Sequence, residues 1–140
     1  MEIPKVIKDL LENEELCAMA TCSENQPYIS LMNFTFVEEE NRVILSSRRD
    51  SKKYSNIQNN KNVSLLFSSP HEISATFLGT AVTIKNDVEE KHYKELHMKR
   101  NNMPQFILGD NVGIIAFNID KIIVSDNEDQ ISVVKANKEV

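Results

Sequence analysis

The segment from residue 46 to residue 53 concentrates side chains that can bind an anion. Its hydroxyl and basic residues are Ser46, Ser47, Arg48, Arg49, Ser51, Lys52 and Lys53. Arginine and lysine provide positive charge together with hydrogen-bond donors, and serine hydroxyls add further donors. A phosphate ester needs this set of partners. Because the whole chain has a net charge of −5, this local concentration of positive charge favours a phosphate site over a solvated basic turn.

The flanking residues place the basic segment between a strand and a helix. An apolar run at 42–45 predicts a strand that ends at the serines, and a second run at 62–67 predicts the next strand. Between them, residues 51–59 are expected to form a short helix. The first turn of a helix has backbone N–H groups without intrahelical partners, and such groups bind anions. We therefore expect the helix start and the basic side chains to act together.

The remaining periodicities predict an α+β, barrel-like domain of mostly antiparallel strands. Further helices are expected at 3–13 and 87–100, and further strands at 16–21, 28–37, 72–85, 112–119 and 122–125. We predict one domain over residues 1–126 and a polar tail over residues 127–140. Within that tail, residues 131–134 (ISVV) have the composition of an edge strand.

Two of these strands carry a more specific expectation. Residues 28–37 (YISLMNFTFV) are mostly apolar on both faces, which predicts a central strand. Gly79 lies in the middle of the strand expected at 72–85, which predicts a β-bulge or a close approach of another backbone.

Composition and charge argue against several classes of protein. The acidic balance disfavours general binding to nucleic acid or to an anionic membrane, because both need an extended positive field. No apolar run approaches the roughly 20 residues of a membrane span, and residues 1–15 lack an apolar signal segment. The expected location is therefore the cytoplasm. The chain also lacks the glycine-rich loops of dinucleotide-binding and P-loop proteins.

Side chains for acid–base or metal chemistry form no convergent pattern. The histidines are His71, His92 and His97, and we expect them at the surface or at an interface. Cys17 and Cys22 lie five positions apart on an expected strand, so they should point to opposite faces and remain reduced. We predict no metal site and assign no catalytic residue.

The succession of elements resembles the pyridoxamine 5'-phosphate oxidase-like family, whose members are FMN-binding split β-barrels. The specific feature is Ser47–Phe67 (SRRDSKKYSNIQNNKNVSLLF), which is similar to the family's hydroxyl–x–x–x–Ser–basic–Lys turn with its following helix and strand. Weaker similarity comes from CAMATCSENQPYIS, which starts at Cys17, and from FLGTA, which starts at Phe77. The resemblance covers residues 5–126 and implies a mostly antiparallel six-stranded split β-barrel with two to three flanking helices.

The resemblance also implies FMN as the cofactor and gives roles to particular residues. The phosphate would lie at Ser47, Ser51, Lys52 and Lys53, with Arg48 or Arg49 as an alternative contact and Ser46 among the cofactor residues. The ring would lie against Ser30, Leu31, Met32 and Asn33. The second set combines apolar and polar side chains, which can give a flat ring an apolar face and polar partners. Family members are usually homodimers with the flavin site at the interface. Phe106 and the loop 101–111 are weak candidates for what the partner supplies.

Two departures from the family pattern bear on function. The true oxidases carry an arginine and a glutamine that support the cofactor, and the matching positions here are Ser30 and Ser74. They also end in a segment with tryptophan, glycine and arginine that holds the vitamin substrate, and this chain has no tryptophan. We include Ser30 and Ser74 among the expected cofactor contacts, but we do not expect oxidation of pyridoxamine phosphate.

Two functions remain open at this point. One is an FMN-dependent oxidoreductase that acts on an unidentified small molecule or electron acceptor. The other is a non-catalytic protein that binds FMN, or a deazaflavin or haem in the same groove. The first is favoured, because a flavin carries the chemistry itself and needs only to be bound and oriented by the protein.

Overall fold

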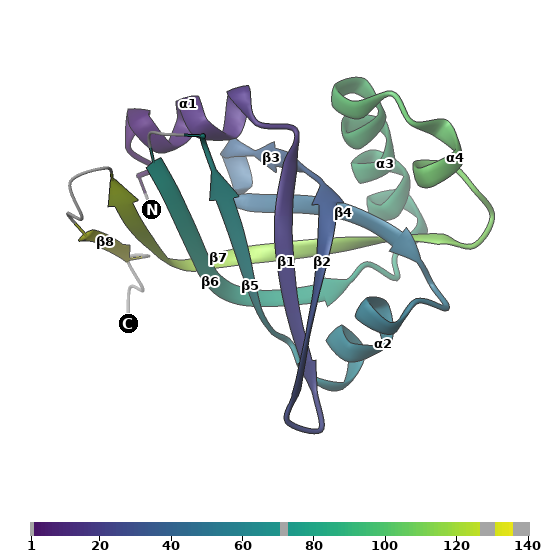
Figure 1. Ribbon diagram of the computed structural model, residues 1–140. Helices are drawn as coiled ribbons and strands as arrows, with labels where there is room; N and C mark the ends of the chain where they lie inside the picture. Colours follow the sequence, from purple (N-terminus) through teal and green to yellow (C-terminus); the bar gives the residue numbers. More distant parts are fainter. Residues whose placement is uncertain (1, 71–72, 127–130, 136–140) are drawn as a thin grey trace, which may run out of the picture.

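The computed structural model describes residues 2–70, 73–126 and 131–135 (Figure 1). Its helices are α1 (Lys5–Asn13), α2 (Lys52–Asn59), α3 (Asp87–Asn101), the single turn α4 (Pro104–Ile107) and the 3₁₀ turn η1 (Glu38–Glu40). Its strands are β1 (Leu16–Ser23), β2 (Gln26–Asn33), β3 (Thr35–Val37), β4 (Arg42–Arg48), β5 (Asn62–Ser68), β6 (Ile73–Thr83), β7 (Val112–Asp126) and β8 (Ile131–Lys135).

The strands form one curled antiparallel sheet in the order β2-β1-β5-β6-β7-β4-β3, and β8 pairs with β7. The predicted α+β, split-barrel class is therefore confirmed. The described residues form eight strands and not six, because the segment 28–37 is divided and because residues 131–135 pair with β7. Residues 127–130 and 136–140 of the expected tail lie outside the described residues.

The core fills the inside of the curled sheet. The ring of Phe67 lies 4.7 Å from the ring of Phe34 in an edge-to-face contact and 4.6 Å from the ring of Phe77, measured between centroids. Helix α1 lies over one end of the sheet (Figure 1) and buries Ile7 and Leu10 in the same cluster. Helices α3 and α4 pack against each other and on β4 and β7, and α2 packs on β1, β4 and β6 (Figure 1).

The expectation of a central strand over residues 28–37 is wrong. The chain breaks at Phe34, so that β2 forms one edge of the sheet and β3 forms the other. Apolar residues on both faces suggested burial of both faces, yet Ile29 and Leu31 on the outer face of β2 are 70% and 68% exposed. Among the residues that the structure describes, no layer covers the outer apolar side chains of this edge strand.

The break at Phe34 is held by the last turn of α3. The guanidinium of Arg100 donates to the carbonyl of Phe34, to that of Leu11 at 2.7 Å and to that of Glu14 at 2.8 Å. It also lies 4.4 Å from the centroid of the Phe34 ring, a cation–π contact. One side chain thus ties the corner between β2 and β3 to the end of α1.

The expectation for Gly79 is confirmed. The pairing of β6 with β7 shifts register between Leu78 and Gly79. A β-carbon at Gly79 would lie 2.0 Å from the carbonyl oxygen of Asn118, so only glycine allows the two backbones to approach this closely. Because β7 continues through this bulge, the strands expected at 112–119 and 122–125 form a single strand.

Candidate functional site

One pocket lies where the end of β4 meets α2, α4 and the corner between β2 and β3. Its volume is about 520 Å³, which is typical of a small-molecule site. Eight of the predicted site residues line it: Leu31, Met32, Asn33, Ser46, Ser47, Arg48, Ser51 and Lys53. The other lining residues are His97, Met103, Gln105, Phe106, Ile107 and Val112. The structure therefore brings most of the expected phosphate residues and ring residues to one cavity.

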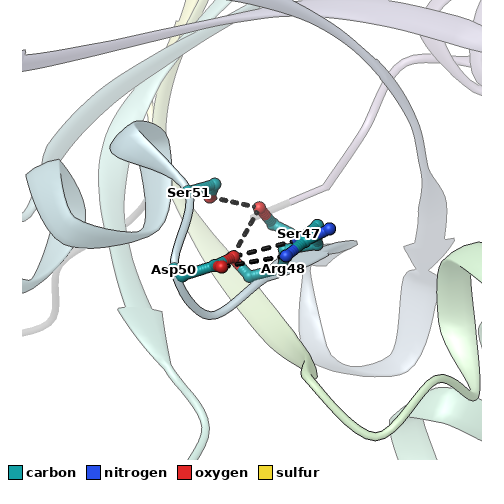
Figure 2. Close-up of polar contacts among 4 residues, drawn as sticks. All are labelled: Ser47, Arg48, Asp50 and Ser51. Atoms are coloured by element: carbon teal, nitrogen blue, oxygen red, sulfur yellow. Dashed lines mark hydrogen bonds and ion pairs between the residues drawn. The ribbon is translucent and has the colours of Figure 1, made fainter.

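A pair of serines joins the end of β4 to the start of α2. The hydroxyl oxygens of Ser47 and Ser51 lie 2.6 Å apart (Figure 2), and the Ser51 hydroxyl also accepts from the backbone N–H of Tyr54 at 3.3 Å. Ser51 is thus the N-cap of α2. The remaining N–H groups of the first turn have no intrahelical partner, and both serines line the pocket beside that turn.

Arg48 lines this pocket but is already engaged. Its Nε and Nη2 atoms donate to the two carboxylate oxygens of Asp50 at 3.0 and 2.9 Å (Figure 2). These hydrogen bonds from Arg48 lower the pKa of the Asp50 carboxyl group. Both side chains are exposed, so the pair is weak and a bound anion could compete with Asp50 for the guanidinium.

The other three cations of the segment differ in position. Lys53 lines the pocket, and no carboxylate of the described residues forms an ion pair with it. The side chain of Lys52 is exposed and does not line the pocket. Arg49 forms an ion pair with Glu90 of α3 and also does not line it. Lys53 is therefore the basic residue best placed to meet an anion in the cavity.

One wall of the pocket is mainly apolar. Met32, Ile107 and Val112 are buried side chains that line it. The exposed Phe106 completes this wall, and its carbonyl accepts a hydrogen bond from the Ser46 hydroxyl at 3.0 Å. Phe106, a weak candidate for what a partner chain supplies, lines the pocket of its own chain. Apolar and sulfur-containing side chains of this kind suit a flat aromatic ring.

Four predicted residues do not line the pocket. Besides Arg49 and Lys52, these are Ser30 and Ser74. Ser74 pairs with Ser125 of β7, whereas Ser47 pairs with Gly113 of the same strand. At about 3.3 Å per residue these positions lie on the order of 40 Å apart along β7, so one chain does not bring Ser74 to the phosphate residues.

Unlike Ser74, Ser30 lies near the pocket, on β2 and two positions from the pocket residue Met32. Its hydroxyl oxygen is fully buried and has no hydrogen-bond partner among the described residues. Ser30 pairs with Met19 across β1, and the sulfur side chain of Met19 is completely buried. The Ser30 side chain therefore faces the core side of β2 and not the pocket.

His97 lines the pocket although it was expected at the surface or at an interface. Its side chain is 1% exposed, and its Nδ1 atom lies 2.7 Å from the Thr35 hydroxyl and 3.1 Å from Nδ2 of Asn101. Burial, with a smaller effect of the Arg100 charge, lowers the pKa of His97 to about 4. The spacing of Tyr93, His97 and Asn101 marks one inward stripe of α3, and this pattern could have located the residue. His71 lies outside the described residues.

The described residues provide no evident nucleophile or metal site. Burial raises the pKa of the Cys17 thiol to about 12, so this cysteine is not a reactive thiolate. Cys17 and Cys22 are both free, as expected. Among residues 2–70, 73–126 and 131–135, no group of three or more histidine, cysteine, aspartate or glutamate side chains could hold a metal ion. No helix in the same ranges is long and apolar enough to cross a membrane.

The lowered pKa of His97 predicts a pH dependence of stability. In the unfolded chain this histidine has a pKa near 6.5 and takes up a proton as the pH falls, whereas in the folded chain it remains neutral down to about pH 4. The free energy of unfolding should therefore fall with pH between 6.5 and 4, by roughly 2–3 kcal/mol at pH 4.5. Urea unfolding at pH 7.0 and 4.5 should show this loss in the natural protein and a smaller loss in His97→Gln. Equal losses in the two proteins would show that His97 is not buried in its neutral form.

Comparisons with known proteins place this geometry in a family. A family model described as pyridoxamine 5'-phosphate oxidase matches residues 3–124. A Schizosaccharomyces pombe protein described as a pyridoxamine 5'-phosphate oxidase homolog is 31% identical over 163 aligned residues, which cover 89% of this chain and 86% of the relative.

Solved structures show the same fold at lower identity. A protein from Clostridium acetobutylicum related to general stress protein 26 superposes with a TM-score of 0.78 at 16% identity and covers 95% of this chain and 94% of its own. A haem binding protein from Mycobacterium smegmatis superposes with a TM-score of 0.78 at 12% identity, over 96% of this chain and 60% of that protein. With most of its length matched by the family model, this chain belongs to the pyridoxamine 5'-phosphate oxidase family.

Proposed function

We propose that this protein binds FMN in the pocket at the end of β4 and acts as an FMN-dependent oxidoreductase on a small molecule. The observation that carries the proposal is the placement of two complementary surfaces in one cavity. The Ser47–Ser51 pair, the start of α2 and the unpaired Lys53 offer donors and charge to a phosphate. The buried side chains of Met32 and Ile107 offer an apolar wall to a ring.

Each part of the pocket has a separate role in this proposal. Lys53, Ser47 and Ser51 would hold the phosphate, and Arg48 would join them by leaving Asp50. Met32, Met103 and Ile107 would orient the ring and exclude water from one of its faces, while Asn33 would offer an amide to its polar edge. Bound FMN would supply the redox chemistry, and the protein would supply binding, orientation and electrostatic tuning.

Two alternatives use the same cavity. The protein could bind FMN without turnover, which needs only the phosphate residues and the apolar wall. It could instead bind a deazaflavin or haem, and the structural similarity to the haem binding protein from Mycobacterium smegmatis directs attention to haem. Reduction of the bound flavin by a nicotinamide cofactor or a partner reductase, followed by reoxidation with a defined acceptor, separates the enzyme from a carrier.

The different positions of two adjacent lysines give a matched test of the phosphate site. Lys53→Ala should weaken FMN binding by about 10-fold or more, since a hydrogen bond to a charged group contributes about 1.5–3 kcal/mol. Lys52→Ala removes the same charge from a side chain outside the pocket and should change the dissociation constant by less than about 3-fold. Fluorescence titration of the apo-protein measures both constants. Equal effects of the two substitutions, or none, would place the phosphate elsewhere.

We also propose that pyridoxamine phosphate is not the substrate. Ser30 and Ser74 stand where the true oxidases have arginine and glutamine, and neither lines the pocket of its own chain. The FMN-loaded protein should therefore produce no pyridoxal phosphate above background when its absorbance is followed with pyridoxamine phosphate present. Turnover near 1 s⁻¹, within the usual range of enzymes, would restore the activity for which the family is named.

The exposed face of β2 supports a homodimer that closes the pocket. Ile29 and Leu31 stand beside Ala18, Ala20 and the 42% exposed Leu66 on the outer face of β2, β1 and β5. Leu31 also lines the pocket, so a second chain on this apolar face would lie next to the cofactor.

Light scattering at micromolar concentration should report a dimer for the natural protein and dissociation for Leu31→Lys. A stable monomer of the natural protein would contradict both the dimer and a shared flavin site.

A further inference from the structure

We propose that His97 presents a fixed Nε2–H donor to the pocket and that this donor binds an acceptor atom on the polar edge of the flavin ring. The inference rests on the proposed function, because it names a contact within the same site. Nδ1 of His97 lies 2.7 Å from the Thr35 hydroxyl and 3.1 Å from Nδ2 of Asn101.

The orientation of the Asn101 amide is fixed by its neighbours. Its Nδ2 atom lies 3.3 Å from the carbonyl oxygen of Phe34 and 3.1 Å from the carbonyl oxygen of His97. Both of these partners are acceptors only, so the nitrogen and not the oxygen of the amide must face them. The same Nδ2 atom lies 3.1 Å from the Thr35 hydroxyl oxygen, and it can only donate there.

The Thr35 hydroxyl then fixes the tautomer of His97. Thr35 is buried, and its proton needs an acceptor. Its side-chain partners among the described residues are Nδ2 of Asn101 and Nδ1 of His97. Since the amide nitrogen has no acceptor capacity, the hydroxyl must donate to Nδ1. A neutral imidazole that accepts at Nδ1 carries its proton on Nε2.

The Nε2 atom is left for a ligand. It has no hydrogen-bond partner among the described residues, and the only fully buried side-chain nitrogen or oxygen without a partner in those residues is the Ser30 hydroxyl. Nε2 is therefore not sealed in the core. Because the imidazole lines the pocket and its Nδ1 side is turned to Thr35 and Asn101, the Nε2–H group is the polar edge that a ligand can reach.

The backbone separation between Thr35, the hydrogen-bond partner of His97, and Ser47 suits the two ends of one cofactor. Thr35 pairs with Ile44 of β4, and Ser47 lies three residues further along that strand, which is about 10 Å. A ribityl chain and its phosphate ester bridge a gap of this order. The pyrimidine edge of a flavin carries carbonyl oxygens and ring nitrogens that accept hydrogen bonds, so it has the chemistry that an Nε2–H donor requires.

The same tautomer disfavours the haem alternative. An axial histidine must offer the lone pair of a ring nitrogen to iron, and here the Nε2 lone pair is occupied by a proton. Moving that proton to Nδ1 would leave the buried Thr35 hydroxyl without an acceptor. The hydrogen bonds around Nδ1 thus favour a ligand with an acceptor atom over a ligand with a metal ion.

The first measurement uses the natural protein without cofactor. Long-range ¹H–¹⁵N correlations of ¹⁵N-histidine-labelled protein at pH 7 should show a protonated Nε2 and an unprotonated Nδ1 for His97. Addition of FMN should shift the Nε2–H proton signal. A His97 protonated on Nδ1 instead, or on both nitrogens, would overturn the inference whatever the protein binds.

The second measurement is FMN affinity in matched variants. His97→Phe should weaken binding by about 3- to 10-fold, the range expected for one neutral hydrogen bond, and should shift the visible bands of bound FMN. His97→Gln should bring the FMN affinity and the visible bands part of the way back to those of the natural protein, because the glutamine amide can donate a hydrogen bond. The control is His92→Phe, the same substitution at an exposed position of α3. It should leave the FMN affinity and the visible bands of bound FMN unchanged.

The two proposals fail in different ways. If the natural protein does not bind FMN, or binds it without dependence on Lys53, the proposed function is wrong. The proposed contact between His97 and the flavin is then wrong as well. If FMN binds and depends on Lys53, but the His97 Nε2–H signal does not move and His97→Phe binds as well as the natural protein, only the inference is wrong. The labelled natural protein decides the tautomer even if a variant does not fold.

Discussion

The hydrogen bonds from Arg100 to the corner at Phe34 are the constraint on which the rest of the structure depends. A chain that continued straight from β2 into β3 would make one long strand and leave the sheet open. Instead, Arg100 binds the Phe34 carbonyl and ring and the last carbonyls of α1. Because of this corner, β2 and β3 lie at opposite edges of the curled sheet. The same corner places Met32 and Asn33 at the pocket and brings the Thr35 hydroxyl within hydrogen-bond distance of His97.

The two halves of the pocket have different structural origins. The half proposed to bind the phosphate, the phosphate half, is local in sequence, because Ser47, Ser51 and Lys53 lie within one turn between β4 and α2, and the N-cap hydrogen bond of Ser51 forms within that turn. The half proposed to bind the ring, the ring half, is non-local, because β2, α3 and α4 reach it from distant parts of the sequence. A substitution in α3 could therefore disturb the ring half and leave the phosphate half intact. Its effect on the absorbance spectrum of bound FMN can then differ from its effect on FMN affinity.

This difference explains what the sequence could predict. The basic turn, the helix after it and the bulge at Gly79 follow from local patterns, and the structure has the elements in those places. The division of residues 28–37 does not follow from a local pattern, since the side chains that hold Phe34 are 66 and 67 positions further along the chain. The burial of His97 was missed for the same reason, because its partner Thr35 is distant in sequence. The exclusion of Lys52, Arg49, Ser30 and Ser74 from the pocket likewise depends on tertiary packing.

Family membership gives the fold, but it does not identify the ligand. The structural relatives include a haem binding protein as well as a protein of the pyridoxine phosphate oxidase family. We propose that the pocket selects FMN over these other ligands. The most direct measurement is a competition, in which the apo-protein is mixed with equal amounts of FMN, a deazaflavin and haem, freed of unbound ligand by gel filtration and examined by absorbance spectroscopy. We expect the two visible bands of bound FMN, whereas a Soret band or a spectrum without any cofactor would show that the pocket does not select FMN.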